Sequence, residues 1–301
     1  MTFAAFWLIL LSIFLHVGWN LLSKKNQPSA AFYLLTSVTS FFLYLPCVFF
    51  AGIDWSALGR GFWCVVLLSI ASEILYFVGL FKTYRSTDIS LAYPMVRALP
   101  VLLVAAVTTL CGIGKPLSGT AFAGMFIVFA GCLLMPLEKF SQFSWRNYVT
   151  PVLGYMILAA CGTTGYTIFD GMLIPQVLAN CSGSQLAATG AFISLLELGI
   201  TTGLSLYVFT SAKERSEFRK IFGHSWAPHI CGICSSSAYI LVVLSMPLVT
   251  NVSFVQAFRQ MSLPLGVAAG IFILKEKCPP VRLAGVAAVV IGLVITALQK
   301  G

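Results

Sequence analysis

Two arginines lie inside long apolar stretches of this sequence. Arg97 lies in ISLAYPMVRALPVLLVAAVTT, residues 89–109, and Arg259 lies in VSFVQAFRQMSLPLGVAAGIFIL, residues 252–274. A guanidinium group near the centre of a bilayer costs at least ~2.5 to 3.5 kcal/mol, so both side chains should face protein or a wet cavity. The planar guanidinium donates paired hydrogen bonds to carboxylate or phosphate oxygens. We therefore expect Arg97 and Arg259 to bind the anionic part of a substrate.

Other polar and aromatic side chains recur at helical spacing within the apolar stretches, which places each set on one face of its helix. Glu73 and Glu197 are candidate proton carriers, because burial favours the neutral form of a carboxyl group, and Glu73 could also bind an amino group. We expect these faces to surround a polar cavity. The remaining predicted substrate-binding residues are His16, Trp19, Asn20, Tyr76, Tyr93, Tyr166, Tyr239 and Gln256.

Several of these residues also have a purely structural interpretation. Glu73 could form a closed ion pair with Arg97, and Glu197 could do so with either arginine. His16 could be a neutral imidazole bonded between helices. Asp170 follows directly after an apolar stretch, so it is interpreted as a loop or capping residue at a helix end.

The composition requires a membrane environment for these residues. Of the 301 residues, 59% are apolar and 9% are charged, whereas a soluble domain carries about 25% charged residues. The mean hydropathy is +0.95. The net charge of +9 comes mostly from short loops, where signals for membrane orientation lie, so we expect a lipid bilayer and no nucleic acid as partner.

The cysteine pattern predicts neither disulfides nor a metal site. The nine cysteines are an odd number, scattered and mostly inside apolar stretches. Cys231 and Cys234 form a CxxC motif, but no second pair or histidine cluster accompanies it. We expect no cofactor.

Ten apolar segments are long enough to cross a hydrocarbon core of about 30 Å. The first has no basic region before it and no cleavage site, so we interpret it as a retained helix rather than a signal peptide. The predicted fold class is therefore an all-α integral membrane protein. The segments are residues 3–22, 30–51, 62–81, 89–111, 118–137, 152–169, 186–210, 226–244, 252–274 and 281–298.

The chain is predicted to contain two copies of a five-helix unit, residues 1–145 and 146–301. Tyr76 is followed after eleven residues by TDIS, and Tyr239 after eleven residues by TNVS. Glycines seven residues apart recur in the last helix of each copy, where helices can pack closely. They are Gly124 with Gly131, and Gly285 with Gly292.

An odd number of helices in each copy predicts that the second copy is inverted in the membrane. The bias of basic residues between alternate loops reverses from one copy to the other, as an inverted repeat requires. Summed over the chain, the odd-numbered loops carry 13 Lys and Arg residues, and the even-numbered loops with the termini carry 3. This distribution predicts that both termini face away from the cytoplasm.

Two runs of sequence carry a family resemblance: HVGWNLLSKK at the end of the first segment, and LPLGVAAGIFILKEKCPPVRLAGVAAVVIGLVI across the last two. With these runs and its two five-helix copies, the whole chain resembles the EamA-type carriers of the drug/metabolite transporter superfamily. Within the second run, Pro264, Glu276, Gly285 and Gly292 match the pattern of that family, whereas Lys115 stands where the first copy should have the glutamate. The resemblance implies a carrier of small metabolites that works by alternating access, and it implies cytoplasmic termini, opposite to the charge distribution.

The expected function is secondary active transport of a small polar metabolite across the cytoplasmic membrane. The substrate should be anionic or zwitterionic, such as an amino acid or a compound bearing phosphate or phosphonate. The chain has no Walker motif, so a proton gradient or an exchange substrate should drive transport. Two alternatives remain: an intramembrane lipid-handling protein or enzyme, which would need a motif such as HExxH or GxSxG, and a non-transporting scaffold. We expect no enzymatic activity.

Overall fold

The computed structural model describes residues 2–26, 29–86, 89–142, 152–272 and 278–298. Within these ranges the structure is helical, with an isolated bridge in place of strands. The long helices are α1 (Phe3–Lys25), α2 (Ala30–Phe50), α3 (Arg60–Ser86), α4 (Ile89–Leu110), α5 (Gly119–Leu134), α7 (Leu153–Ala179), α8 (Gln185–Thr210), α10 (Ala227–Ser245) and α13 (Pro280–Ala297). The shorter elements are α9 (Ala212–Ile221), α11 (Val252–Phe258), α12 (Ser262–Phe272), and the 3-10 turns η1 (Trp55–Ala57), η2 (Phe140–Gln142), η3 (Met246–Leu248) and η4 (Arg259–Met261).

The helices follow the ten predicted apolar segments with three differences. The sixth segment continues as α7 to Ala179, well beyond its predicted end at residue 169. The ninth segment is divided into α11 and α12 by the 3-10 turn η4. The polar loop after α8 forms an additional helix, α9, whose N-terminus is capped by the side chain of Ser211.

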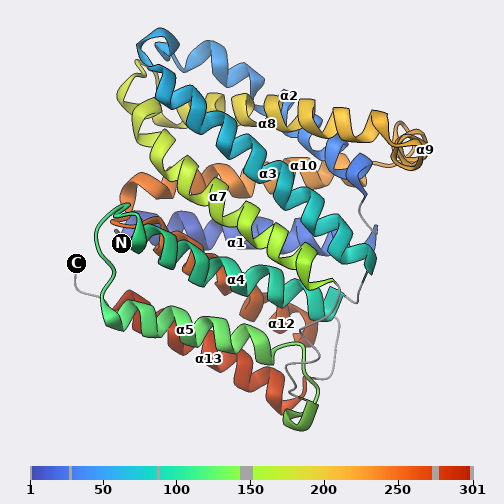
Figure 1. Ribbon diagram of the computed structural model, residues 1–301, viewed down its shortest axis with the longest axis vertical. Helices are drawn as coiled ribbons and strands as arrows, with labels where there is room; N and C mark the ends of the chain where they lie inside the picture. The colour runs from blue at the N-terminus through green and yellow to red at the C-terminus, as the bar shows by residue number, and fades with distance from the viewer. Residues whose placement is uncertain (1, 27–28, 87–88, 143–151, 273–277, 299–301) are drawn as a thin grey trace.

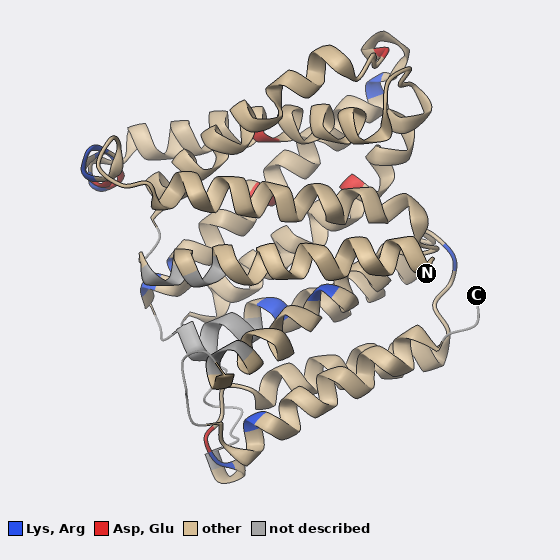
Figure 2. Ribbon diagram, turned by 180° about the vertical axis from the view of Figure 1, so that it is seen from behind, with Lys and Arg blue, Asp and Glu red and all other residues tan. Residues whose placement is uncertain are grey.

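The outer surface of the bundle is apolar, as a lipid environment requires. Among the described residues, six helices are long and apolar enough to cross a membrane, as in a multi-pass membrane protein. Large apolar side chains point outward, including Phe49, Leu110 and Phe272, which are 79%, 85% and 81% exposed. Figure 2 shows most charged residues near the helix ends and a few midway along the bundle.

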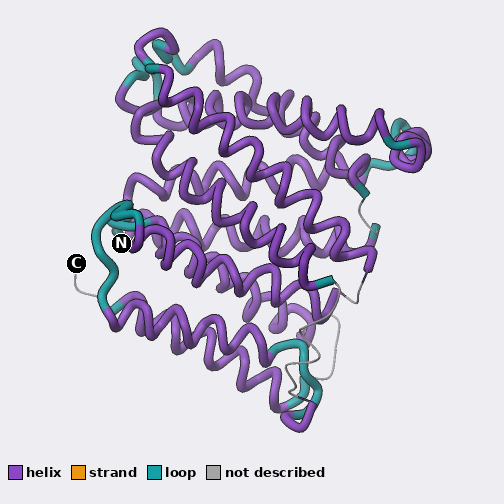
Figure 3. The backbone as a smooth tube through the Cα atoms, in the orientation of Figure 1, coloured by secondary structure: helices purple, strands orange, loops and turns teal. Residues whose placement is uncertain are grey.

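The two halves of the chain, residues 1–145 and 146–301, pack against each other through pairs of helices. The most extensive pairs are α3 with α7, α2 with α8, α5 with α13, and α1 with α10. In Figure 1 these helices lie side by side, with each blue or green helix of the first half beside a yellow, orange or red helix of the second. Figure 3 shows the connecting loops gathered at the two ends of the bundle. The most extensive contacts between helices therefore lie between the two halves.

One end of the bundle, near the N-terminus, is joined by backbone hydrogen bonds between the halves. We call it the hydrogen-bonded end. Lys115 N donates to Thr250 O over 2.9 Å, and Ile53 lies opposite Cys181 in an antiparallel bridge. The two bonds that flank this bridge run from Ser182 N to Gly52 O and from Asp54 N to Asn180 O, each 3.0 Å long.

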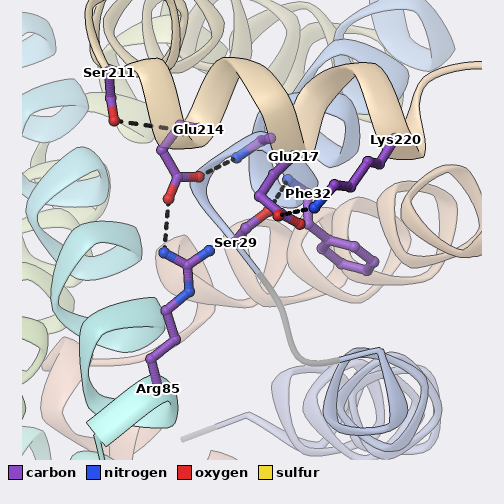
Figure 4. A network of polar contacts seen from close by, with 8 residues as sticks. Ser29, Phe32, Arg85, Ser211, Glu214, Glu217 and Lys220 are labelled. Carbon is purple, nitrogen blue, oxygen red and sulfur yellow. Dashed lines mark hydrogen bonds and ion pairs between the residues drawn. The ribbon is translucent and has the colours of Figure 1, made fainter.

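The other end, which we call the α9 end, is joined by a buried carboxylate. Glu214 on α9 is 3% exposed, accepts a hydrogen bond from the backbone N–H of Ala31 over 3.3 Å, and forms a 2.7 Å ion pair with Arg85. Figure 4 shows this network, in which one side chain of the second half contacts α2 and α3 of the first. A carboxylate at the first turn of α2 is stabilised by the free N–H groups of that helix end.

The glycines of α5 and α13 allow the two helices to approach closely, as predicted. A Cβ atom on Gly131 would lie 2.7 Å from Gly285 O and 2.8 Å from Val289 N. Gly124 lies equally close to the backbone of Gly292. These contacts involve backbone atoms, which cannot move aside by a change of side-chain rotamer.

We expect Gly131→Ala to lower the free energy of unfolding by about 1–3 kcal/mol, because the helices must separate to admit the methyl group. Gly119→Ala in the same helix is the matched control, since a Cβ atom there meets no atom within 4 Å. That substitution should leave stability unchanged or slightly higher. Thermal unfolding of the purified protein in detergent measures both variants, and equal midpoints would contradict the close packing.

Candidate functional site

A cavity lies midway along the bundle, between both halves of the chain. The empty space inside it is about 730 Å³, a figure that includes the parts open to the surroundings. Side chains from α1, α2, α3, α7, α8, α10 and η4 form its wall. Eight of the predicted substrate-binding residues line it: His16, Trp19, Glu73, Tyr76, Tyr166, Glu197, Tyr239 and Arg259.

Three tyrosines from different helices form one side of the cavity. The ring centroids of Tyr76 and Tyr166 are 5.8 Å apart, and those of Tyr166 and Tyr239 are 5.7 Å apart, both in edge-to-face contact. The guanidinium carbon of Arg259 lies 5.9 Å from the centroid of Tyr239, at the distance of a cation–π contact. The tyrosines thus provide a rigid polar and aromatic wall beside a positive charge.

Arg259 is a buried cation at the wall of the cavity. Arg259 is 8% exposed, and its Nη1 atom has no hydrogen-bond partner among the described residues. Among the described residues, the ion pairs are Arg85 with Glu214 and Lys220 with Glu217. Arg259 therefore has no carboxylate counterion among these residues. A buried charge without a counterion is costly unless a ligand supplies one. The geometry therefore suits an anionic group in the cavity.

Arg97, which was predicted to bind the substrate together with Arg259, does not occupy an equivalent position. It does not line the cavity; its Nη2 atom donates to the backbone oxygen of Arg259 over 3.1 Å and to Ser262 Oγ over 2.6 Å. Arg259 begins η4, where the helix is interrupted, and Ser262 directly follows this turn. Arg97 thus holds the break that positions Arg259, and direct contact between Arg97 and a substrate stays a prediction.

Two glutamates contribute carboxylates to the cavity. Glu197 accepts a hydrogen bond from Ser37 Oγ over 2.5 Å, whereas no described hydrogen bond reaches the carboxylate of Glu73. The structural alternative paired Glu73 with Arg97 and Glu197 with either arginine, whereas the ion pairs seen among the described residues are Arg85 with Glu214 and Lys220 with Glu217. Glu73 is consequently available to a cationic group in the cavity.

The interpretation of Asp170 as a loop or capping residue is wrong. Asp170 lies inside α7, is completely buried, and accepts hydrogen bonds from Ser69 Oγ over 2.5 Å and from the Tyr239 hydroxyl. The apolar stretch is interrupted at Asp170 and Gly171, so the helix was predicted to end at residue 169. The available signal was helical spacing, because Asp170 lies one turn after Tyr166 on the same face.

The remaining predicted site residues are only partly placed. His16 Nδ1 accepts a 3.0 Å hydrogen bond from Trp19 Nε1, so these two residues of α1 orient each other at the cavity wall. Gln256 is 2% exposed and lies outside the cavity lining. The side chains of Asn20 and Tyr93 lie outside the described residues, as does Glu276.

Comparison with known proteins shows the fold alone. No protein-family model and no curated protein matches the sequence. A protein of known crystal structure has a TM-score of 0.70 to this chain, with 99% of this chain and 98% of that one covered. Their sequences are 14% identical, so the likeness extends to the path of the chain and not to its chemistry.

The different positions of the two arginines predict different effects on stability. Arg97→Gln should lower the free energy of unfolding by about 1.5–3 kcal/mol for each hydrogen bond from the charged group that is lost at the break. Arg259→Gln should lower it less, because the neutral amide avoids the cost of burying a cation. Thermal unfolding in detergent compares the two variants. A larger loss for Arg259→Gln would show that Arg259, rather than Arg97, holds this part of the fold.

Proposed function

We propose that this protein is a secondary transporter of a small polar metabolite that carries an anionic group. The proposal rests on the position of Arg259 at the wall of a cavity inside an apolar bundle. This residue is a buried cation without a counterion among the described residues. A carboxylate, phosphate or phosphonate would supply the missing charge and accept two hydrogen bonds from the guanidinium. We place the protein in the cytoplasmic membrane.

The cavity also has a subsite for a positive group, so a zwitterion fits it. The carboxylate of Glu73 and the faces of Tyr76 and Tyr166 line the same space as Arg259. Carboxylates and aromatic faces both attract an ammonium group. An amino acid or an amine bearing phosphate could bind with its anion at Arg259 and its cation at Glu73.

The pattern of helix contacts supports an inverted repeat of two five-helix units. If α1 to α5 correspond in order to α7, α8, α10, the α11–α12 pair and α13, then the contact of α1 with α10 is equivalent to that of α3 with α7. The contacts of α2 with α8 and of α5 with α13 each map onto themselves. This is the pattern of a twofold axis through the cavity, and it agrees with the proposed membership of the EamA-type carriers.

Alternating access follows naturally from this arrangement. In transporters with inverted repeats the site lies near the bilayer midplane, often at an interrupted helix, and one repeat rocks against the other. Here the cavity lies between the halves, next to the break at η4. Proton binding or exchange of substrates would drive the cycle. A scaffold protein would not require a buried cation facing an interior cavity.

Thermal unfolding in the presence of candidate ligands tests the proposal. The compounds are glutamate, succinate and phosphoethanolamine, with choline as a cation that has no anionic group. A ligand at 100 times its dissociation constant adds about 2.7 kcal/mol to the free energy of unfolding, which raises the midpoint visibly. We expect at least one of the first three to raise it and choline to have no effect.

Variants show whether the stabilisation comes from the proposed site. Arg259→Gln should abolish the ligand-dependent shift, whereas Arg60→Gln, at an exposed position, should keep it. Stabilisation by choline alone, or a full shift in Arg259→Gln, would contradict the anion site. A compound that binds should also be taken up or exchanged by proteoliposomes, and binding without movement would contradict transport.

A further inference from the structure

Both carboxylate oxygens of Asp170, which lies on α7 in the second half, accept hydrogen bonds, and one of these bonds crosses to the first half. Oδ1 accepts a 2.5 Å hydrogen bond from Ser69 on α3, in the first half, and Oδ2 accepts one from the hydroxyl of Tyr239 on α10, in the second. Asp170 and Ser69 are both 0% exposed. The carboxyl group is thus held on both sides in a site that water does not reach.

The charged groups around Asp170 do not neutralise it as an ion. Of the elements packed against α7, α3 carries Glu73, α8 carries Glu197, α10 carries Tyr239 and α4 carries Arg97. Among the described residues no cation forms an ion pair with Asp170. The cation Arg259 contacts the ring of Tyr239, whose hydroxyl group bonds to Asp170. The carboxyl group of Glu73 interacts electrostatically with that of Asp170, so a negative charge on one would repel a negative charge on the other.

A buried carboxylate in these surroundings is far more stable with a proton bound. Taking an unpaired carboxylate out of water costs so much that such groups usually become neutral instead. Hydroxyl groups can both donate and accept hydrogen bonds, so Ser69 and Tyr239 can satisfy either form of the carboxyl group. We propose that Asp170 is a proton-binding site, occupied while the two halves enclose it.

This site differs from the two glutamates predicted as proton carriers. Glu73 and Glu197 line the cavity, where a substrate and water can reach them, whereas Asp170 lies behind Tyr239. Movement of the first half away from α7 would break the hydrogen bond from Ser69 and admit water, which would allow the proton to leave. A role in coupling proton movement to transport rests on the proposed function, but the proton site itself does not.

Infrared spectroscopy of the purified protein at neutral pH tests the site without any substrate. A protonated carboxyl group gives a carbonyl-stretch band that carboxylates and amides do not. We expect Asp170→Asn to lose one component of this band, and we expect Asp54→Asn, at an exposed loop position, to keep every component. A band in Asp170→Asn identical to that of the parent would overturn the proposal.

A second variant keeps the test decisive if Asp170→Asn does not fold. Ser69→Ala removes one hydrogen-bond donor from Asp170 without changing a residue of the cavity lining. It should shift the frequency of the same component, whereas an unshifted band would overturn the assignment to Asp170. Because the probe is the proton alone, a failure of the ligand-binding experiments would leave this result unaffected, and the reverse is also true.

Discussion

Ionisable groups inside an apolar bundle must be neutralised or paired, and this constraint organises the structure. Asp170 is enclosed by hydroxyl groups, Glu197 is bonded to Ser37, and Arg259 lies over an aromatic ring at the edge of a cavity. Ser69 and Ser37 lie in the first half of the chain, whereas Asp170 and Glu197 lie in the second. These two contacts therefore also hold the two halves together, so a change of charge at either carboxyl group can change how the halves pack.

The interrupted helix shows how a positive charge is brought to the cavity. At η4 the backbone leaves the α-helical pattern, and the guanidinium of Arg97 bonds to the Arg259 carbonyl and to Ser262. One arginine thereby donates to a backbone oxygen at the break, and the other lines the cavity. Two residues that look equivalent in the sequence consequently have different roles, one in positioning the turn and one in facing the site.

The sequence predicted the helices and the cavity wall because both follow from simple patterns. Apolar runs determine the helix cores, and helical spacing places His16, Tyr76 and Tyr166 on inward faces, where the structure finds them. Local patterns could not show which polar residues meet across the halves, since these contacts depend on packing. The fate of Asp170 illustrates this, because its burial depends on Ser69 and on Tyr239, each more than sixty residues away.

The division of the ninth segment at η4 was missed although Pro264 signals it. A proline has no N–H to donate to the carbonyl four residues earlier, here that of Gln260 in η4, and its ring clashes with that carbonyl. The helix α9 was missed for a different reason: its sequence, AKERSEFRKI, is polar and resembles a loop. It is stabilised by a tertiary contact, the ion pair of Glu214 with Arg85, which has no local signature in the sequence.

The most direct test of alternating access is to close the hydrogen-bonded end with a disulfide and then to measure from which face of the membrane a cysteine in the cavity can be labelled. Ile53 and Cys181 form a non-hydrogen-bonded antiparallel pair, in which Cα atoms are about 4.5 Å apart and a disulfide fits. In Ile53→Cys with the other native cysteines replaced, oxidation should join the two loops. A cysteine at Ser235, in the cavity wall, should then be labelled only from the α9 face, and reduction should restore labelling from both faces. Labelling from both faces with the disulfide intact would contradict alternating access.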